Sequence, residues 1–97
     1  MIVVTSSEFI REFKSLDNAE AFLVAKTLVK LEDSPVPIGK MTRGKLAGCY
    51  TIRCGQGGRL RLIYRHQVQT AKLITIGARQ AGTVYLQAAL IIGKEKR

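Results

Sequence analysis

The stretch from Cys49 to Arg65, CYTIRCGQGGRLRLIYR, predicts two strands joined by a glycine-rich loop. Three of the four residues from Gly55 to Gly58 are glycines, which reach positive φ angles at little cost and let the chain reverse. Successive residues of a strand point to opposite faces of the sheet. The hairpin therefore places its arginines on one face and its large apolar residues on the other. The arginine face takes Thr51, Arg53, Arg59, Arg61 and Arg65, and the apolar face takes Tyr50, Ile52, Leu60, Leu62 and Tyr64.

Four guanidinium groups on one sheet face repel one another unless an anion lies over them. The hairpin contains no carboxylate that would neutralise them. We therefore interpret this surface as an anion-binding face. The alternative is a solvated sheet face of mixed character.

The net charge of +9 is distributed unevenly along the chain. Up to Asp33 there are four basic and six acidic residues, whereas from Ser34 onward there are twelve basic residues and one acidic residue. Such asymmetry favours a polyanionic partner for the second half. Nucleic acid fits best, and an acidic protein segment comes next. A membrane surface fits less well, because the arginines follow strand patterns and not an amphipathic helix.

The chain of 97 residues predicts a single domain over residues 1–97, with a hydrophobic content of 46% that is ordinary for a globular protein. No basic segment precedes the first apolar residues, so no signal peptide is expected. The apolar run from Val84 to Ile92 is far shorter than the roughly 20 residues that a membrane span needs. We expect a cytoplasmic protein that does not enter a membrane.

The two cysteines, Cys49 and Cys54, lie five residues apart in one predicted strand. They then point to opposite faces and stand roughly 16 Å apart, too far for a mutual disulfide or a shared metal. With His66 as the single histidine, the sequence holds no ligand cluster. No metal and no small-molecule cofactor is expected.

The first half of the chain predicts a strand and two helices. Ile2 to Val4 is a β-branched strand, and Thr5 with Glu8 has the spacing of a helix cap. The helix that follows carries Phe9, Phe13 and Leu16 on one face. Asp17 with Glu20 repeats the capping spacing for a second helix, which ends near Asp33 before the prolines. These helices form an antiparallel hairpin that buries its apolar faces on the sheet.

The second half adds a loop, a strand and a helix to the arginine hairpin. Residues 39–48 are loop-like and carry three cations suited to phosphate contacts, Lys40, Arg43 and Lys45. Lys72 to Ile76 predicts a strand with Ile74 and Ile76 directed inward, and with Thr75 and Arg79 on the outer, arginine face. Residues 83–92 predict a short apolar helix, although their first residues would also suit a strand.

The order of elements is strand, two helices, a three-strand antiparallel meander and a terminal helix. With the segments LEDSP, GCYTIR, RLIYR and IGARQAGTVY, this order resembles the RelE/ParE toxin superfamily, and more closely its RelE branch. The resemblance covers nearly the whole chain. It implies an α+β fold, in which a small antiparallel sheet carries the N-terminal two-helix hairpin on one face and a short C-terminal helix completes the domain.

The resemblance also implies an activity. RelE-like toxins cut messenger RNA in the ribosomal A site without a metal, by attack of a ribose 2′-OH on the adjacent phosphate. By position, Arg61 matches the arginine that holds the scissile phosphate, and Tyr85 matches the tyrosine proposed as general base. The catalytic set implied in this way is Arg53, Arg61, Arg79 and Tyr85. The RNA-binding set is Lys40, Arg43, Lys45, Thr51, Arg59 and Arg65.

One position departs from the family pattern. Thr51 stands where RelE relatives carry a lysine that could help the leaving 5′-oxygen, and Arg59 or Lys45 would have to substitute for it. The physical chemistry of the remaining set suits the reaction, because arginine binds phosphate with its planar fork and stays charged. Tyrosine is a poor base at its free pKa of about 10, so Tyr85 needs to lie close to Arg61 and Arg79.

Two further functions stay open. The chain would also suit a ParE-like inhibitor that binds DNA gyrase and cuts no RNA, although such a binder has no need of Arg61, Arg79 and Tyr85 together. An RNA-binding module without cutting activity is the other, because of Thr51. Both toxin functions imply a cognate antitoxin, an acidic or amphipathic protein segment that covers the basic face or displaces the terminal helix. Its apolar contacts would include Val84, Ala88 and Ile91.

Overall fold

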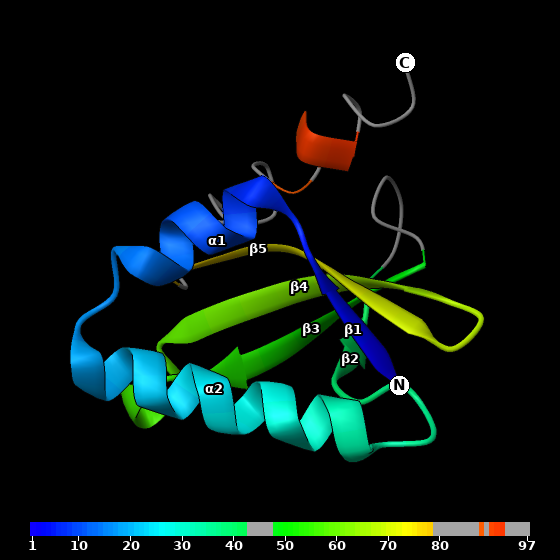
Figure 1. Cartoon of the computed structure of the whole chain (residues 1–97), viewed down its shortest axis with the longest axis horizontal. Helices are drawn as coiled ribbons and strands as arrows, with labels where there is room; N and C mark the ends of the chain where they lie inside the picture. Colours follow the sequence, from blue (N-terminus) through cyan, green and yellow to red (C-terminus); the bar gives the residue numbers. More distant parts are fainter. Residues whose placement is uncertain (43–47, 79–87, 89, 93–97) are drawn as a thin grey trace.

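The computed structural model describes residues 1–42, 48–78, 88 and 90–92. Within them a mixed sheet of five strands in the order β1-β5-β4-β3-β2 carries a pair of helices (Figure 1). The strands are β1 (Ile2–Thr5), β2 (Lys40–Met41), β3 (Cys49–Cys54), β4 (Leu60–Gln67) and β5 (Thr70–Ala78), and the helices are α1 (Ser7–Lys14) and α2 (Asn18–Asp33). A single 3-10 turn, η2 (Gln56–Gly58), connects β3 to β4. Residues 88 and 90–92 are helical.

The predicted fold class is confirmed, including the antiparallel meander β3-β4-β5, the N-terminal helix pair and the short C-terminal helix. Two strands extend the meander at its edges. β1 runs parallel to β5, which makes the sheet mixed. β2 pairs antiparallel with β3, so the start of the segment 39–48, predicted as a loop, is a short edge strand.

The two helices begin at side-chain caps. Asp17 caps α2 as predicted, because its Oδ1 accepts a hydrogen bond of 2.8 Å from the backbone N–H of Glu20. The cap of α1 is Ser6, one residue later than the predicted Thr5, and its Oγ accepts from the N–H of Phe9. Ser6 is preferred because its hydroxyl also donates to the carbonyl of Ile74, which ties the start of α1 to the sheet.

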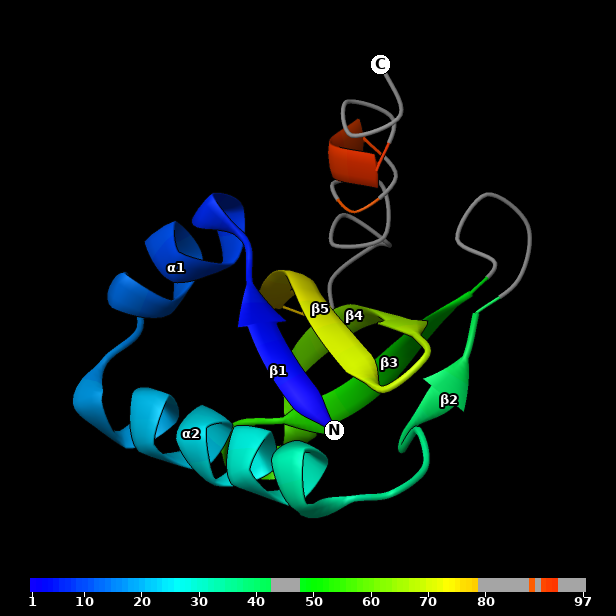
Figure 2. The ribbon, with the colours of Figure 1, turned by 45° about the vertical axis from the view of Figure 1, so that its right-hand side comes forward.

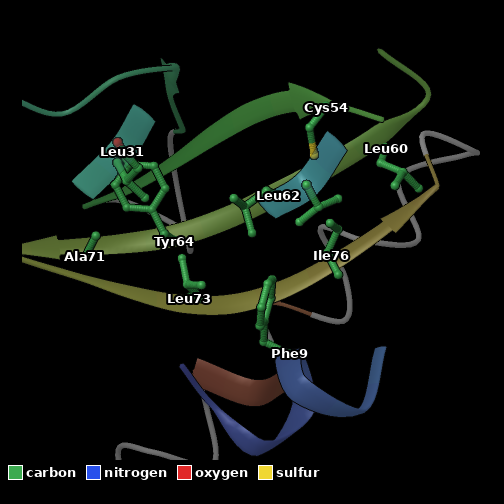
Figure 3. Close-up of a cluster of buried hydrophobic side chains, with 10 residues drawn as sticks. Phe9, Leu31, Cys54, Leu60, Leu62, Tyr64, Ala71, Leu73 and Ile76 are labelled. Carbon is green, nitrogen blue, oxygen red and sulfur yellow. The ribbon is translucent and has the colours of Figure 1, made fainter. Parts of the chain in front are cut away.

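The main core lies between the helix pair and one face of the sheet. Phe9 of α1 stacks on Phe13 with 5.9 Å between ring centroids, and Phe9 lies fully inside the cluster. The buried members of this core are Phe9, Val24, Leu31, Cys54, Leu60, Leu62, Tyr64, Ala71, Leu73 and Ile76 (Figure 3). Phe22, which follows the helical pattern of α2, is 63% exposed, and the ammonium of Lys26 lies over its ring. The expected apolar face of α2 is therefore narrower than its sequence suggests.

A β-bulge divides the apolar residues of β5 between the two faces. The β4–β5 register shifts between Ile63 and Tyr64, which leaves Ile74 as an extra residue. Ile74 joins Ile63 in a second core on the far face, and Ile76 stays in the main core. The prediction that Ile74 and Ile76 point to the same side is wrong for this reason.

The second core is completed by the C-terminal segment. Ala88, Ile91 and Ile92 pack on Cys49, Ile63 and Ile74. Figure 2 shows these helical residues on the other side of the sheet from α2. The prediction that Cys49 and Cys54 point to opposite faces is confirmed, since one lies in each core, and neither is in a disulfide.

Candidate nucleic-acid interface

The β3–β4 register brings two arginines of neighbouring strands directly opposite each other. Arg53 pairs with Arg61, Thr51 pairs with Ile63, and Cys49 pairs with Arg65. Residues opposite each other in an antiparallel pair share a face, so these side chains project from the side of the second core. The β3–β4 hairpin therefore has an arginine face, on which Arg53 and Arg61 lie side by side next to the η2 turn.

Arg61 is held in place although it carries a charge. It is only 8% exposed, and its Nη1 donates a hydrogen bond of 3.0 Å to the carbonyl of Gly58. On its other side the sheet partner is Gly77, which has no side chain. Guanidinium groups present five donors in a fixed fork, so donors remain for a ligand after the bond to Gly58.

Arg53 belongs to β3, and its side chain approaches the same loop residue, Gly58. A Cβ at Gly58 would stand 3.6 Å from the Nε of Arg53, in ordinary van der Waals contact. Arg53 is exposed, in contrast to Arg61. The pair therefore combines one fixed cation with one accessible cation, on the two sides of a single turn.

Arg59 departs from the predicted face. It precedes β4, and its Nε lies 3.0 Å from Oε1 of Glu20 in an ion pair with α2. The hairpin does lack a carboxylate of its own, but α2 supplies one from outside. Arg59 is thus engaged on the helix side of the sheet and does not add to the Arg53–Arg61 pair.

Thr51 and Lys40 stand beside the arginine pair. Thr51 is 7% exposed, and its Oγ1 is the one buried side-chain oxygen without a hydrogen-bond partner among the described residues. Lys40 of β2 lies directly across from Thr51, on the same face, and is exposed. The hydroxyl of Thr51 therefore lies next to Arg53 along β3, and the ammonium group of Lys40 lies diagonally across from Arg53 on β2.

Arg65 lies on the same face of the sheet as Arg61 but at a distance from the Arg53–Arg61 pair. It lies four residues along β4 from Arg61, which corresponds to about 13 Å in a strand. Its sheet neighbours are Cys49 and Lys72, and Ile63 lies between it and Arg61. Arg65 therefore belongs to the end of the face that the second core occupies.

Four of the predicted site residues lie outside the described residues: Arg43, Lys45, Arg79 and Tyr85. Thr75, predicted on the outer face with Arg79, is fully buried there, and its hydroxyl donates to a carboxylate oxygen of Glu12 in α1. Of the predicted apolar contact stripe, Ala88 and Ile91 are buried in the second core, and Val84 is also outside the described residues.

A groove of about 510 Å³ extends the basic surface from Arg53 onto α2. Lys26 and Lys30 of α2 line it on one side, with Asp33 as the acidic residue among them. Cys54 and Gly55 line the other side. The groove is thus continuous with the strand that carries Arg53.

Two ionisable groups of the main core, Tyr64 and Cys54, have raised pKa values and stay neutral. Burial, opposed in part by hydrogen bonding to Ile38, raises the pKa of Tyr64. Burial also raises the pKa of Cys54 to about 11, and the neighbouring Glu20 carboxylate adds to the rise. A neutral phenol and a neutral thiol in the main core are packing groups.

Glu20 of α2 contacts the loop between β3 and β4, which the sequence did not predict. Its carboxylate is 3% exposed and accepts from Arg59 and from the N–H of Gln56. The spacing to Asp17 suggested a capping role. A helical wheel would have separated the two, because Glu20 lies at i−4 from Val24 and at i−11 from Leu31, on the buried side of α2.

The described residues contain no group of His, Cys, Asp and Glu side chains arranged to hold a metal ion. None of the described helices has the length and apolar character of a transmembrane segment.

No protein-family model matches the chain, and no curated protein matches it either. Solved structures do. A free E. coli RelE mutant with two arginines replaced by alanine is 25% identical, with a TM-score of 0.76 over 94% of this chain and 96% of that chain. The isolated E. coli RelE toxin is 22% identical, with a TM-score of 0.69 over 94% and 97% of the two chains.

The toxin–antitoxin complex RelBE2 of Mycobacterium tuberculosis also matches, at 25% identity and a TM-score of 0.69, over 80% of this chain and 96% of that chain. The chain therefore has a RelE-like toxin fold, and the resemblance drawn from the sequence segments is confirmed at the level of the fold.

Proposed function

We propose that this protein is the toxin of a type II toxin–antitoxin pair and a ribosome-dependent mRNA endonuclease that inhibits translation. The observation that carries the proposal is the pair Arg53 and Arg61, opposite each other on a RelE-like sheet. Structures similar to this chain include RelE toxins, alone and bound to antitoxins. The substrate is mRNA on the ribosome, in the cytoplasm, and the reaction needs no metal.

In the proposed reaction the ribose 2′-oxygen attacks the adjacent phosphorus as its proton is removed, and the bond from phosphorus to the 5′-oxygen breaks. The 5′-oxygen takes up a proton, which leaves a 2′,3′-cyclic phosphate and a 5′-hydroxyl. Negative charge grows on the phosphoryl oxygens on the way. Cations fixed beforehand stabilise that charge without reorganising, and Arg61 is fixed by Gly58.

The remaining roles follow from position. Arg53 binds the phosphate with Arg61, and Arg79 adds a third guanidinium. Tyr85 removes the proton from the 2′-OH, with its phenolate favoured by these cations. Arg43, Lys45 and Arg65 contact the RNA backbone on either side of the cut.

Lys40 can replace the lysine that RelE relatives carry at the position of Thr51. Of the two substitutes suggested by the sequence, Arg59 is paired with Glu20, and Lys45 lies outside the described residues. Lys40 lies opposite Thr51 and carries an ammonium group, a better proton donor than a guanidinium. We assign Lys40 to the leaving 5′-oxygen and the unpartnered hydroxyl of Thr51 to a phosphate oxygen.

The antitoxin in this proposal acts on the second core. Ala88 and Ile91 pack against the sheet residues Cys49, Ile63 and Ile74. An antitoxin helix with similar apolar residues would displace Ala88 and Ile91 and pack on the same sheet residues. An acidic stretch of the same partner would neutralise Arg53 and Arg61. A co-encoded small protein with both features is expected next to this reading frame.

Induction in cells, followed by mapping of mRNA 5′ ends, tests the proposal. Wild type should produce cuts within translated codons, and Arg79→Ala and Tyr85→Phe should abolish them. Growth arrest with intact mRNA and trapped DNA breaks would support instead the second candidate, a gyrase inhibitor. Cuts that persist in both variants would refute the assigned chemistry.

A further inference from the structure

Glu20 links helix α2 to the loop between the two arginine strands. Its Oε1 accepts from the Nε of Arg59 at 3.0 Å, and its Oε2 accepts from the backbone N–H of Gln56 at 3.4 Å. The two bonds grip the loop at both ends of its 3-10 turn. Because Glu20 is only 3% exposed, water could not easily form these hydrogen bonds to its carboxylate if Arg59 and Gln56 moved away. A buried charge without partners is costly, so these contacts are strongly favoured in the folded state.

The loop is shaped to receive this carboxylate. Gly55 has φ of +81°, and a Cβ there would stand 2.4 Å from Oε2 of Glu20, closer than real atoms approach. Gly55 therefore meets two demands at once, a left-handed backbone and close approach of a carboxylate.

Backbone hydrogen bonds within the loop connect the residues that Glu20 holds to Gly58. The N–H of Gly58 donates to the carbonyl of Gly55 at 3.2 Å, and the N–H of Arg59 donates to that of Gln56 at 3.3 Å. The carbonyl of Gly58 in turn accepts from Nη1 of Arg61. Three steps thus lead from the Glu20 carboxylate to the guanidinium of Arg61. A Cβ on Gly58 would also stand within van der Waals contact of the Arg53 side chain.

We propose that Glu20 is a positioning residue: by holding the loop through Arg59 and Gln56, it fixes the Gly58 carbonyl and thereby the direction of the Arg61 guanidinium. The catalytic consequence rests on the proposed nuclease function. The exposed half of the ion pair, Arg59, has 64% of its side chain in solvent, so simple charge attraction contributes little. Its importance lies in where it holds the loop.

The test uses the full chain with Glu20→Gln, Arg59→Gln and the double variant, in single-turnover cleavage of mRNA on programmed ribosomes. Each single variant should lower the saturating rate constant about 10-fold, since small misplacements of a catalytic group cost up to about 10²-fold. The concentration for half-maximal rate should change less than about twofold. The double variant should be no slower than Glu20→Gln, because loss of the Glu20 carboxylate already removes the ion pair with Arg59.

Asp17→Ala is the matched control. It removes the cap of the same helix, at a cost of about 1 kcal/mol, and leaves the linkage to the loop intact. Its saturating rate should equal that of wild type. An equal loss of rate in Asp17→Ala and Glu20→Gln would overturn the proposal, as would additive losses in the double variant.

A second readout separates this inference from the proposed function. In ¹⁵N-edited side-chain spectra of wild type, the Nη groups of Arg61 should give separate, slowly rotating signals because Nη1 is hydrogen-bonded. In Glu20→Gln they should merge, and in Asp17→Ala they should not. If wild type cuts no RNA, the nuclease proposal fails while this spectrum still decides on Glu20. Unchanged Arg61 signals in Glu20→Gln would refute the positioning role.

Discussion

The two faces of the sheet are built from alternate residues of the same strands, yet they serve different ends. On the helix side, Leu62 and Tyr64 are fully buried under α1 and α2. On the other side, Arg61 and Ile63 alternate with them, and the cover is a small cluster that includes Ala88 and Ile91. Among the described residues, the helix side therefore holds the larger buried apolar cluster, and the other side carries the Arg53–Arg61 pair beside its own cluster.

This comparison teaches why a chain of this length can present several cations on its sheet. Burial of apolar side chains is the main favourable term in folding, and within the described part of the chain the larger buried cluster lies on the helix side. The opposite face buries a second cluster with Ala88, Ile91 and Ile92, and the Arg53–Arg61 pair lies on the same face.

The largest effect that would sharpen the comparison concerns Leu62. Leu62→Ala should lower the free energy of unfolding by about 2–5 kcal/mol, because it leaves a cavity in the main core. Urea denaturation measures the change. The rate of RNA cleavage per folded molecule should stay near that of wild type. A variant as stable as wild type would show that the helix side does not dominate the fold.

Its neighbour Arg61 should behave in the opposite way. Arg61→Gln should lower the rate of mRNA cleavage by about 10²–10³-fold, because a fixed donor to the developing charge is lost. The glutamine amide still reaches toward Gly58, so the thermal midpoint should move by only a few degrees. Arg11→Gln, an exposed change on α1, serves as the control and should cleave normally. Equal cleavage by Arg61→Gln would remove Arg61 from the site.

A smaller effect distinguishes the faces by pH. Burial raises the pKa of Cys54 from 9.0 to about 11, so the folded state holds the thiol proton more tightly than the unfolded state. The stabilisation is fully present below pH 9 and is lost as the pH rises toward 11. Between these values wild type should lose on the order of 2 kcal/mol more than Cys54→Ala. Parallel pH profiles of the two proteins would contradict the shift.

The smallest effect compares the two thiols under native conditions. Cys49 lies under the second core and Cys54 lies in the main core, five residues along the same strand. Local lifting of the C-terminal residues should expose Cys49, whereas Cys54 should wait for global unfolding. In Cys49→Ala and Cys54→Ala, the remaining thiol reports each face. Cys49 should react at least about 10-fold faster with a thiol reagent, and equal rates would show that the faces open together.

Local rules predicted most of the fold. Alternation alone separated Arg53 and Arg61 from Leu62 and Tyr64, and the structure keeps that separation. Capping chemistry located the start of α2 after Asp17, and the prolines that follow located its end at Asp33. These features depend on neighbours in the sequence, which is why a sequence can report them.

The parts that sequence reasoning missed depend on partners far along the chain. The bulge at Ile74 arises from pairing with β4, and the parallel place of β1 depends on β5. Arg59 was assigned to the arginine face because its partner, Glu20, lies 39 residues away. Lys40 was assigned to a loop because a two-residue edge strand has no periodicity to read.

The account depends most directly on the chemistry at Arg53 and Arg61. Purified protein added to ribosomes that carry a defined mRNA, followed by analysis of the product ends, tests it. We predict cuts within the codon in the A site, with a 2′,3′-cyclic phosphate on one fragment and a 5′-hydroxyl on the other, and their loss in Arg61→Gln. Intact mRNA with the wild-type protein, together with inhibition of DNA gyrase, would contradict it.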